Sequence, residues 1–287
     1  MKIVDSIAGL RAQVAAWRAG DGRAGDGRAG DGRVGNGRVG GDRVALVPTM
    51  GALHEGHVSL VEAARKHAGR VVVSIFVNPT QFAPHEDFDR YPRDLQADAA
   101  KLGGGTDLIF APTVREMYPD GFATTVSVGG PSEGLETDFR PHFFAGVATV
   151  VAKLLVAAMP DVAVFGEKDW QQLQVIRRLV ADLALPIEIV GAPIMREADG
   201  LAMSSRNAYL KPGERAVAGR MNVILREARD PGAAKQALLD AGFDSVDYVA
   251  VRDAITLGPA SSGPKRILAA ARIGGTRLID NMEFAHA

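Results

Sequence analysis

The sequence contains no cysteine among its 287 residues. This absence excludes disulfide bonds, thiolate metal sites and a cysteine nucleophile, and it is compatible with a reducing cytoplasm. The formal net charge is only −1, so the chain has no general attraction to nucleic acid or to an anionic membrane. No apolar run reaches the roughly 18 residues of a membrane span, and the first residues lack the apolar core of a secretory signal. We therefore expect neither a membrane span nor a secretory signal.

Glycine is concentrated in one segment, residues 20–43, where the unit G-[DN]-G-R-[AV] repeats. The segment begins with G-x-G-x-x-G, a pattern that can bind the pyrophosphate of a dinucleotide when it follows a strand and opens a helix. Here the apolar spacing predicts a helix before the pattern, over 6–18, and none after it. We interpret the segment as a flexible linker or insertion. A calcium-binding turn is a further alternative, although the apolar positions of a β-roll are missing.

Hydrophobic residues make up 47% of the chain, enough for a sizeable core. After the repeat, apolar segments typical of buried strands alternate with segments of helical periodicity. The predicted strands are 43–48, 71–77, 106–110, 162–165 and 187–194, with a further short strand at 124–128. The predicted helices between them are 56–67, 92–102, 146–158 and 169–183.

This alternation predicts an α/β fold with a doubly wound, parallel, Rossmann-like sheet over residues 1–194. Such sheets bind ligands at the carboxyl ends of their strands. We expect residues 195–287 to form a second, smaller α+β domain. Its predicted helices and strands are 215–228, 232–241, 246–251, 266–273 and 276–281.

Two histidines, His54 and His57, flank Gly56 at the start of a predicted helix. Zinc proteases carry H-E-x-x-H, with histidines four apart, so the spacing of three here disfavours a zinc site. A helix N-terminus offers unpaired N–H groups and positive potential to an anion, and imidazoles add donors for charge that develops on a phosphate. The pattern predicts a phosphate site. A purely structural role as helix caps is the alternative.

Neutral amides follow the strand at 71–77, where Asn78 and Gln81 flank Pro79. Amides at this position suit a substrate with hydroxyl or carboxylate groups. An Asn-Pro turn with a solvated glutamine is the structural alternative.

Charged groups follow the strand at 162–165, where Lys168 can bind phosphate and Asp169 can accept hydrogen bonds from ribose or cap the helix, with Gln172 one turn further. Further along, Ser204–Arg206 offers hydroxyl, backbone and guanidinium donors to a triphosphate, unless it is only a solvated loop. Together these groups predict a site for a nucleotide and a small polar substrate.

Five motifs stand in the order and approximate spacing of one family, and over residues 44–283 the chain resembles the pantothenate synthetases (pantoate–β-alanine ligases). These motifs are PTMGALHEGH, SIFVNPTQF, FGEKDWQQ, DGLAMSSRN and RLIDN. The H-x-G-H element alone is typical of the wider nucleotidyl-transferase superfamily, so the specificity comes from the five motifs together.

The resemblance implies a reaction in two steps. The pantoate carboxylate attacks the α-phosphate of ATP, giving pantoyl adenylate and pyrophosphate, and the amine of β-alanine then attacks the acyl carbon, giving pantothenate and AMP. Adenylation provides a good leaving group, so the enzyme supplies positioning and charge stabilisation rather than a nucleophile. The resemblance also implies Mg²⁺, a cytoplasmic location and a homodimer.

By the same resemblance, the catalytic residues are His54, His57, Lys168 and Arg206, with His57 as proton donor. Gln81, Gln172 and Asn78 are the expected substrate-binding residues, the two glutamines holding pantoate. Asp98 is the candidate protein ligand of Mg²⁺, an ion that rests mainly on phosphate oxygens and water. The expected residues of the ATP site are Met50, Gly51, Ala52, Leu53, His54, Glu55, Gly56, His57, Gly166, Glu167, Lys168, Asp169, Met195, Met203, Ser204, Ser205 and Arg206.

Two features differ from the family pattern. The repeat lengthens the connection before the strand at 43–48, on the amino edge of the sheet, so it should not obstruct the site. The segment RPHFFAGV places Phe143 where the family usually has histidine, with His142 one position earlier. We predict that activity survives, because every group expected to contact phosphate is present.

Two other functions remain possible on the residues alone. A nucleotidyl-transferase acting on another small acid or a phosphate ester would use the same phosphate groups, although a phosphorylated acceptor would require further Lys or Arg. A non-catalytic nucleotide-binding protein is the alternative from a different class. The intact set of His54, His57, Lys168 and Arg206 argues against it.

Overall fold

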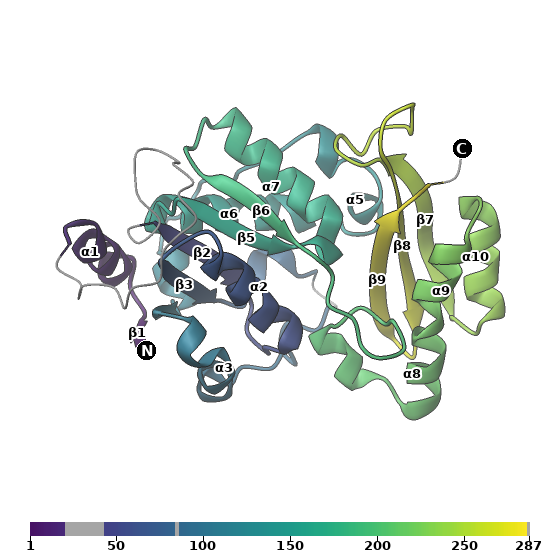
Figure 1. Cartoon of the computed structure of the whole chain (residues 1–287), viewed down its shortest axis with the longest axis horizontal. Coiled ribbons are helices and arrows are strands. Elements are labelled where there is room, and N and C mark those ends of the chain that lie inside the picture. Colours follow the sequence, from purple (N-terminus) through teal and green to yellow (C-terminus); the bar gives the residue numbers. More distant parts are fainter. Residues whose placement is uncertain (21–42, 84–85, 286–287) are drawn as a thin grey trace.

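The computed structural model describes residues 1–20, 43–83 and 86–285, which form two β-sheets with helices packed on them (Figure 1). Within these residues the larger sheet has six parallel strands in the order β1-β4-β3-β2-β5-β6. They are β1 (Lys2–Val4), β2 (Val44–Thr49), β3 (Arg70–Ile75), β4 (Leu108–Phe110), β5 (Val162–Gly166) and β6 (Glu188–Ala192). The predicted doubly wound α/β fold is confirmed.

Helices cover both faces of the larger sheet because its strands direct apolar side chains to both sides. One core contains Leu46 of β2 together with residues of α1, α6 and α7, and the other contains Val47 of β2 together with residues of α2 and α3. The helices of the first part are α1 (Ile7–Arg18), α2 (Glu55–Arg65), α3 (Leu95–Leu102), α4 (Val114–Met117), α5 (Glu136–Phe139), α6 (Phe143–Ala158) and α7 (Trp170–Asp182).

The smaller sheet is antiparallel, in the order β7-β8-β9, and belongs to the C-terminal part of the chain. Its strands and accompanying helices are α8 (Pro212–Ala218), α9 (Arg220–Glu227), α10 (Pro231–Asp240), β7 (Ser245–Asp253), β8 (Lys265–Ile273) and β9 (Thr276–Glu283). The helices form a core with one face of the sheet. From its other face Leu268 packs against Leu135, which lies in the first part of the chain.

The structure corrects three of the sequence predictions. A strand was not predicted at Lys2–Val4, where β1 pairs with β4, because three residues are too few to show a period. The strand predicted at 124–128 is absent from the described residues, since this extended segment has no neighbouring strand to pair with. The helix predicted at 215–228 is two helices, α8 and α9, separated at Gly219.

Two further observations concern the whole chain. Most of the repeat at 20–43, and with it the predicted linker, lies outside the described residues. Within residues 1–20, 43–83 and 86–285, none of the helices combines the length and apolar character that crossing a bilayer requires.

Candidate active site

The order of the strands brings the two main motifs together. β2 pairs with β3 on one side and with β5 on the other. The sheet therefore extends outward from β2 in both directions. In parallel sheets the crevice beyond the carboxyl ends of such neighbouring strands is the usual ligand site. The histidine motif follows β2 and the Lys168 turn follows β5. Groups about 110 residues apart in sequence therefore meet at one edge of the sheet.

A cavity of about 990 Å³ lies at this edge and extends to the smaller sheet. Fifteen of the residues predicted from sequence line it: Met50, His54, Gly56, His57, Asn78, Gln81, Gly166, Lys168, Asp169, Gln172, Met195, Met203, Ser204, Ser205 and Arg206. Six are not among its lining residues: Gly51, Ala52, Leu53, Glu55, Asp98 and Glu167. The four predicted catalytic residues thus share one cavity.

The two histidines cap the helix that carries them. His54 is the N-cap of α2, and its Nδ1 accepts a hydrogen bond from the Gly56 N–H at 3.1 Å. The Nδ1 of His57 accepts one from the His54 N–H at 3.2 Å. Because both Nδ1 atoms accept, each neutral ring carries its proton on Nε2. The capping role therefore coexists with a donor on each ring for a ligand.

Gly56 allows this arrangement. A Cβ at position 56 would lie 2.8 Å from Cε1 of the His54 ring, which is closer than real contacts allow. The two imidazole centroids are only 4.1 Å apart. Glycine between the histidines is thus a steric requirement of the pair.

Both imidazoles are neutral at physiological pH. Burial, helped by the charges of Lys168 and Lys101, lowers the pKa of His54 to about 4. Burial, together with His54 and Lys168, lowers the pKa of His57 to about 3. In this state the rings offer neutral N–H donors rather than cations, and the positive charge beside them comes from lysine.

Asp98 shapes the loop between β2 and α2. Its buried carboxylate accepts hydrogen bonds from the N–H groups of Ala52 and Leu53, at 3.1 and 2.7 Å. Gly51 has a φ of +81°, and a Cβ there would lie 2.9 Å from Oδ2 of Asp98. Among the described residues no group of three or more His, Cys, Asp or Glu side chains is arranged to hold a metal ion. The role of Asp98 as a metal ligand stays a prediction.

The amides after β3 are held from several sides. Asn78 donates to Oε1 of Gln81 at 3.0 Å and to the Gly146 carbonyl at 3.2 Å, and it accepts from the Tyr118 hydroxyl at 2.7 Å. The Nε2 of Gln81 lies 3.0 Å from the Met50 sulfur. Asn78 thus fixes the side chain of Gln81 at the cavity wall.

The two adjacent glutamines of α7 differ in their surroundings. Gln171 is buried, and its amide bonds to the Glu136 N–H and to carbonyl groups that include that of Gly134. Gln172 is half-buried and lines the cavity. The described contacts therefore leave Gln172 as the glutamine of this pair that can face a substrate.

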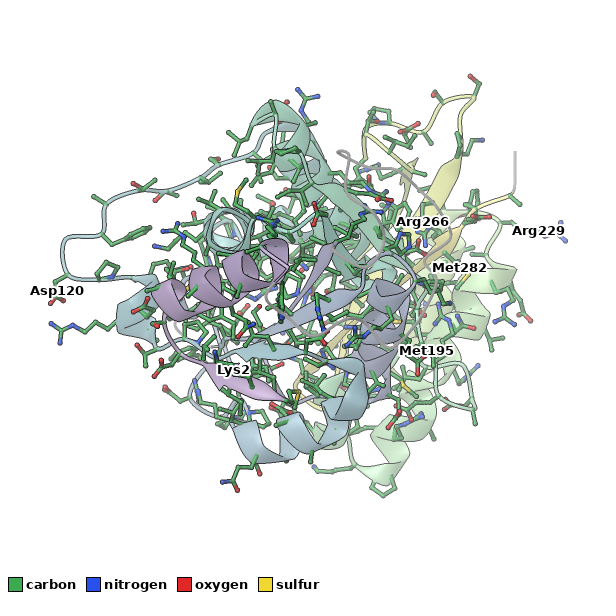
Figure 2. All side chains as sticks on the ribbon, turned by 60° about the vertical axis from the view of Figure 1, so that its left-hand side comes forward. Lys2, Asp120, Met195, Arg229, Arg266 and Met282 are labelled. Carbon is green, nitrogen blue, oxygen red and sulfur yellow. The ribbon has the colours of Figure 1, made fainter. Side chains whose placement is uncertain are left out.

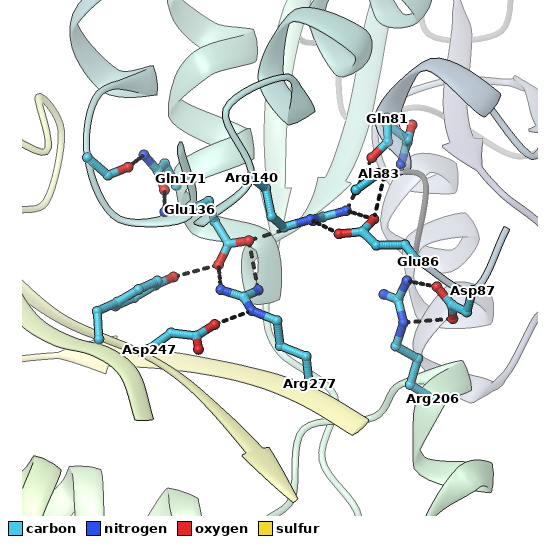
Figure 3. A network of polar contacts seen from close by, with 12 residues as sticks. Gln81, Ala83, Glu86, Asp87, Glu136, Arg140, Gln171, Arg206, Asp247 and Arg277 are labelled. Atoms are coloured by element: carbon cyan, nitrogen blue, oxygen red, sulfur yellow. Dashed lines mark hydrogen bonds and ion pairs between the residues drawn. The ribbon is translucent and has the colours of Figure 1, made fainter. Parts of the chain in front are cut away.

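Charged residues link the two parts of the chain across the cavity (Figure 3). Arg206 donates to both carboxylate oxygens of Asp87, at 2.8 and 3.1 Å. Arg277 of β9 donates to both oxygens of Glu136 at 2.8 Å, and within the first part of the chain Arg140 pairs with Glu86. The guanidinium predicted to bind phosphate is thus paired with an aspartate in this structure.

Phe143, which replaces the usual histidine of the family pattern, lines the cavity beside Arg140. The guanidinium carbon of Arg140 lies 3.9 Å from the centroid of the Phe143 ring, a cation–π contact. His142 is not among the lining residues, and its buried Nε2 has no hydrogen-bond partner among the described residues. His142 therefore does not take the place of the missing imidazole.

The sequence analysis missed the residues that support the site from a distance. Glu136, Arg277 and Asp87 join elements far apart in sequence, and local patterns do not show such pairs. The RLIDN motif is the one signal in the sequence for these residues, because it matches the family pattern but carries no predicted role. Its last residue, Asn281, binds the turn that carries Lys168.

Comparison with known proteins gives a consistent result. The family model described as pantoate-beta-alanine ligase matches residues 2–283. A pantothenate synthetase of Mesorhizobium japonicum is 56% identical over 295 residues, covering 98% of this chain and 97% of that protein. One of Caulobacter vibrioides is 52% identical over 297 residues, with 98% and 97% covered.

Solved structures agree with these sequence relatives. A pantothenate synthetase from Thermus thermophilus superposes with a TM-score of 0.85 at 43% identity, covering 99% of both chains. A pantoate-beta-alanine ligase from Francisella tularensis, complexed with beta-gamma ATP and beta-alanine, gives a TM-score of 0.80 at 32% identity, covering 99% of this chain and 97% of that one.

Proposed function

The chain belongs to the pantoate–β-alanine ligase family, and we propose that the cavity between its two sheets is where it joins pantoate to β-alanine at the expense of ATP. The reaction itself, ATP-dependent formation of an amide bond, is the activity of this family. The observation that carries the location is the convergence of both histidines, Lys168 and the two glutamines on a single cavity.

In the first step, the pantoate carboxylate attacks the α-phosphate of ATP and pyrophosphate leaves. The Nε2–H groups of His54 and His57 would donate to phosphate oxygens as charge develops there, and Lys168 would neutralise part of that charge. The phosphates would also compete with Asp87 for Arg206. The two imidazoles are already oriented before ATP arrives, because each Nδ1 accepts a backbone N–H group, whereas Arg206 would have to leave Asp87.

In the second step, the β-alanine amine attacks the acyl carbon of pantoyl adenylate, and AMP leaves with the electrons of the C–O bond. We assign pantoate to Gln81 and Gln172, which line the same cavity as the phosphate-binding groups. Gln81, held by Asn78, would also lie near the incoming amine. The remaining residues predicted for the ATP site keep that role in the proposal.

Mg²⁺ fits this site as part of the nucleotide substrate. Both carboxylate oxygens of Asp98 accept backbone N–H groups, and the described residues contain no cluster of acidic or histidine ligands for a metal. Mg²⁺ that arrives on the triphosphate keeps phosphate and water as its main ligands. We therefore assign no catalytic step to a protein-bound metal.

We also propose a homodimer in the cytoplasm, where ATP is available. Support for the dimer comes from residues 124–128, a largely exposed, β-branched segment that the sequence pattern predicted as a strand. Figure 2 shows Asp120 at the outer end of the loop that leads into it. An exposed segment with β-branched residues and no partner strand of its own can pair with another chain. Analytical ultracentrifugation tests this: a single species near the chain mass of 30.3 kDa would contradict the dimer.

Formation of AMP tests the catalytic proposal. With ATP present, AMP and pantothenate should appear in equal amounts only when both pantoate and β-alanine are supplied. Equal release of AMP with unrelated small acids would overturn the substrate assignment. Binding of ATP without any cleavage would indicate a non-catalytic nucleotide-binding protein.

A further inference from the structure

Asn281 is a buried amide of β9 whose hydrogen bonds cross from the smaller sheet to the larger one. Its Nδ2 donates to the carbonyl groups of Glu167 at 3.0 Å and of Lys168 at 2.8 Å. Its Oδ1 accepts from Nε of Arg266. The side chain is only 2% exposed. Although it lines the cavity, all its polar atoms are engaged with protein groups.

The surroundings of Asn281 permit only one orientation of its amide. Arg266 can only donate and the two carbonyls can only accept, so the oxygen faces Arg266 and the nitrogen faces the turn. Arg266 is fixed in its turn, because its guanidinium lies 3.5 Å from the centroid of Trp170, whose Nε1 donates to the Ala254 carbonyl at 2.8 Å. The amide therefore bonds to the turn in a defined direction.

The Lys168 turn depends on this external support. Residues Glu167–Asp169 form a single 3-10 turn between β5 and α7, and the residues at its start and at the start of α7 provide no side-chain cap. The carbonyls of Glu167 and Lys168 are bound by Asn281 instead. The backbone from which the Lys168 side chain extends is thus held from β9.

We propose that Asn281 is a positioning residue for the ligase reaction, which holds Lys168 where the phosphates of ATP require it. The inference rests on the proposed role of Lys168. Asn281 acts through the turn and not on a substrate. A shift of about 1 Å in a positioned group can cost on the order of 100-fold in rate, and this sets the expected scale of the effect.

The test is a double-mutant cycle on the adenylation step, measured as pantoate-dependent exchange of pyrophosphate into ATP. Asn281→Asp keeps the shape of the side chain but presents an oxygen to two carbonyl oxygens. We expect kcat/KM for ATP to fall by roughly 10- to 100-fold. In a Lys168→Ala background the same change should have little further effect, because the group that it displaces is missing.

Three comparisons make the cycle decisive. Asn222→Asp is the matched control, since Asn222 is an equally buried amide of α9 that bonds to Arg226, away from the Lys168 turn. It should leave the exchange rate unchanged. If the effects of Asn281→Asp and Lys168→Ala are additive, Asn281 does not act through Lys168 and the inference is overturned. If Lys168→Ala alone leaves the rate unchanged, the proposed role of Lys168 falls as well.

A milder variant covers the possibility that Asn281→Asp does not fold. Asn281→Ser removes both donated hydrogen bonds without adding charge, and its melting temperature can be compared with that of Asn222→Ser. A lower kcat/KM for ATP with an unchanged KM for β-alanine supports positioning of the phosphate site. If the KM for β-alanine rises by the same factor by which the kcat/KM for ATP falls, the variant is damaged in general and the inference is overturned.

Discussion

A single neutral ring nitrogen carries much of the proposed chemistry. His57 lines the cavity, and its proton lies on Nε2 because Nδ1 accepts the backbone N–H of His54 at the start of the same helix. The backbone bond is thus part of the function, since it selects the tautomer that can donate. The motif showed which residues to choose, but the tautomer follows only from the hydrogen bonds.

Replacing His57 with alanine should remove this donor. We expect turnover to fall by roughly 10²- to 10³-fold, as for other donors that meet charge in a transition state. Steady-state kinetics of AMP formation measure the change. The control is His67→Ala, because His67 lies beyond the end of α2 and does not line the cavity. This variant should keep the wild-type rate. A His57→Ala enzyme of normal turnover would exclude His57 from the mechanism.

At the scale of single residues, the sequence predicted many of the groups that line the cavity but not the groups that hold them. His54, His57 and Lys168 lie in short motifs at strand ends, where spacing carries information. Asn281 lies 113 residues from Lys168, and Asp87 lies 119 residues from Arg206. Contacts over such separations depend on the packing of the two sheets, which local patterns do not encode.

Among the elements, the close approach of α6 to the turn after β3 controls where Gln81 lies. A Cβ on Gly146 would lie 2.4 Å from the Thr80 carbonyl oxygen, so Gly146→Ala must displace this turn or the helix. We expect KM for pantoate to rise by roughly 10-fold or more, because displaced positioning groups are costly. Initial-rate kinetics at varied pantoate measure it.

Gly213→Ala provides the control for this prediction. Its Cβ would meet nothing within 4 Å, near the start of α8. This variant should match the wild type in KM. If Gly146→Ala does so as well, the contact between α6 and the turn does not determine the pantoate site.

The repeat at 20–43 joins α1 to β2, and most of it lies outside the described residues. Because β2 is entered from its amino end, opposite the cavity, deletion of residues 20–39 should leave KM for ATP nearly unchanged. Kinetic comparison of the shortened and full chains tests this. A large increase in KM would show that the glycine-rich pattern binds the nucleotide after all.

The elements also show where sequence patterns are insufficient. Continuous apolar segments identified β2, β3 and β5 because these strands are buried on both faces. The segment 124–128 has equally β-like residues, yet a strand requires a neighbour, and the described chain supplies none. Residue preference predicts an extended backbone there, whereas pairing depends on the remaining structure.

For the whole molecule, the buried histidines link stability to pH. Unfolded histidine has a pKa near 6.5, whereas burial lowers the pKa of His54 to about 4 and that of His57 to about 3. Between these values the unfolded chain binds more protons than the folded one. The free energy of unfolding should therefore decrease as the pH falls from about 6.5 toward 4, and it should lose this dependence above 6.5.

Urea unfolding at pH 7 and pH 5 measures this linkage. In His57→Asn, an amide oxygen can replace Nδ1 as the acceptor but does not titrate. The loss of stability between the two pH values should be smaller than in the wild type by about 1–2 kcal/mol. His67→Asn serves as the control. An unchanged loss in His57→Asn would show that His57 is not buried in its neutral form.

The neighbouring residues Asp280 and Asn281 have a consequence for the order of synthesis. Asp280 pairs with Arg196, at the start of the segment that leads to Ser204–Arg206, while Asn281 binds the Lys168 turn. Among the described strands β9 leaves the ribosome last. A nascent chain can therefore assemble its larger sheet while both halves of the proposed nucleotide site still lack the contacts that hold them, and translation of one short strand then completes that site.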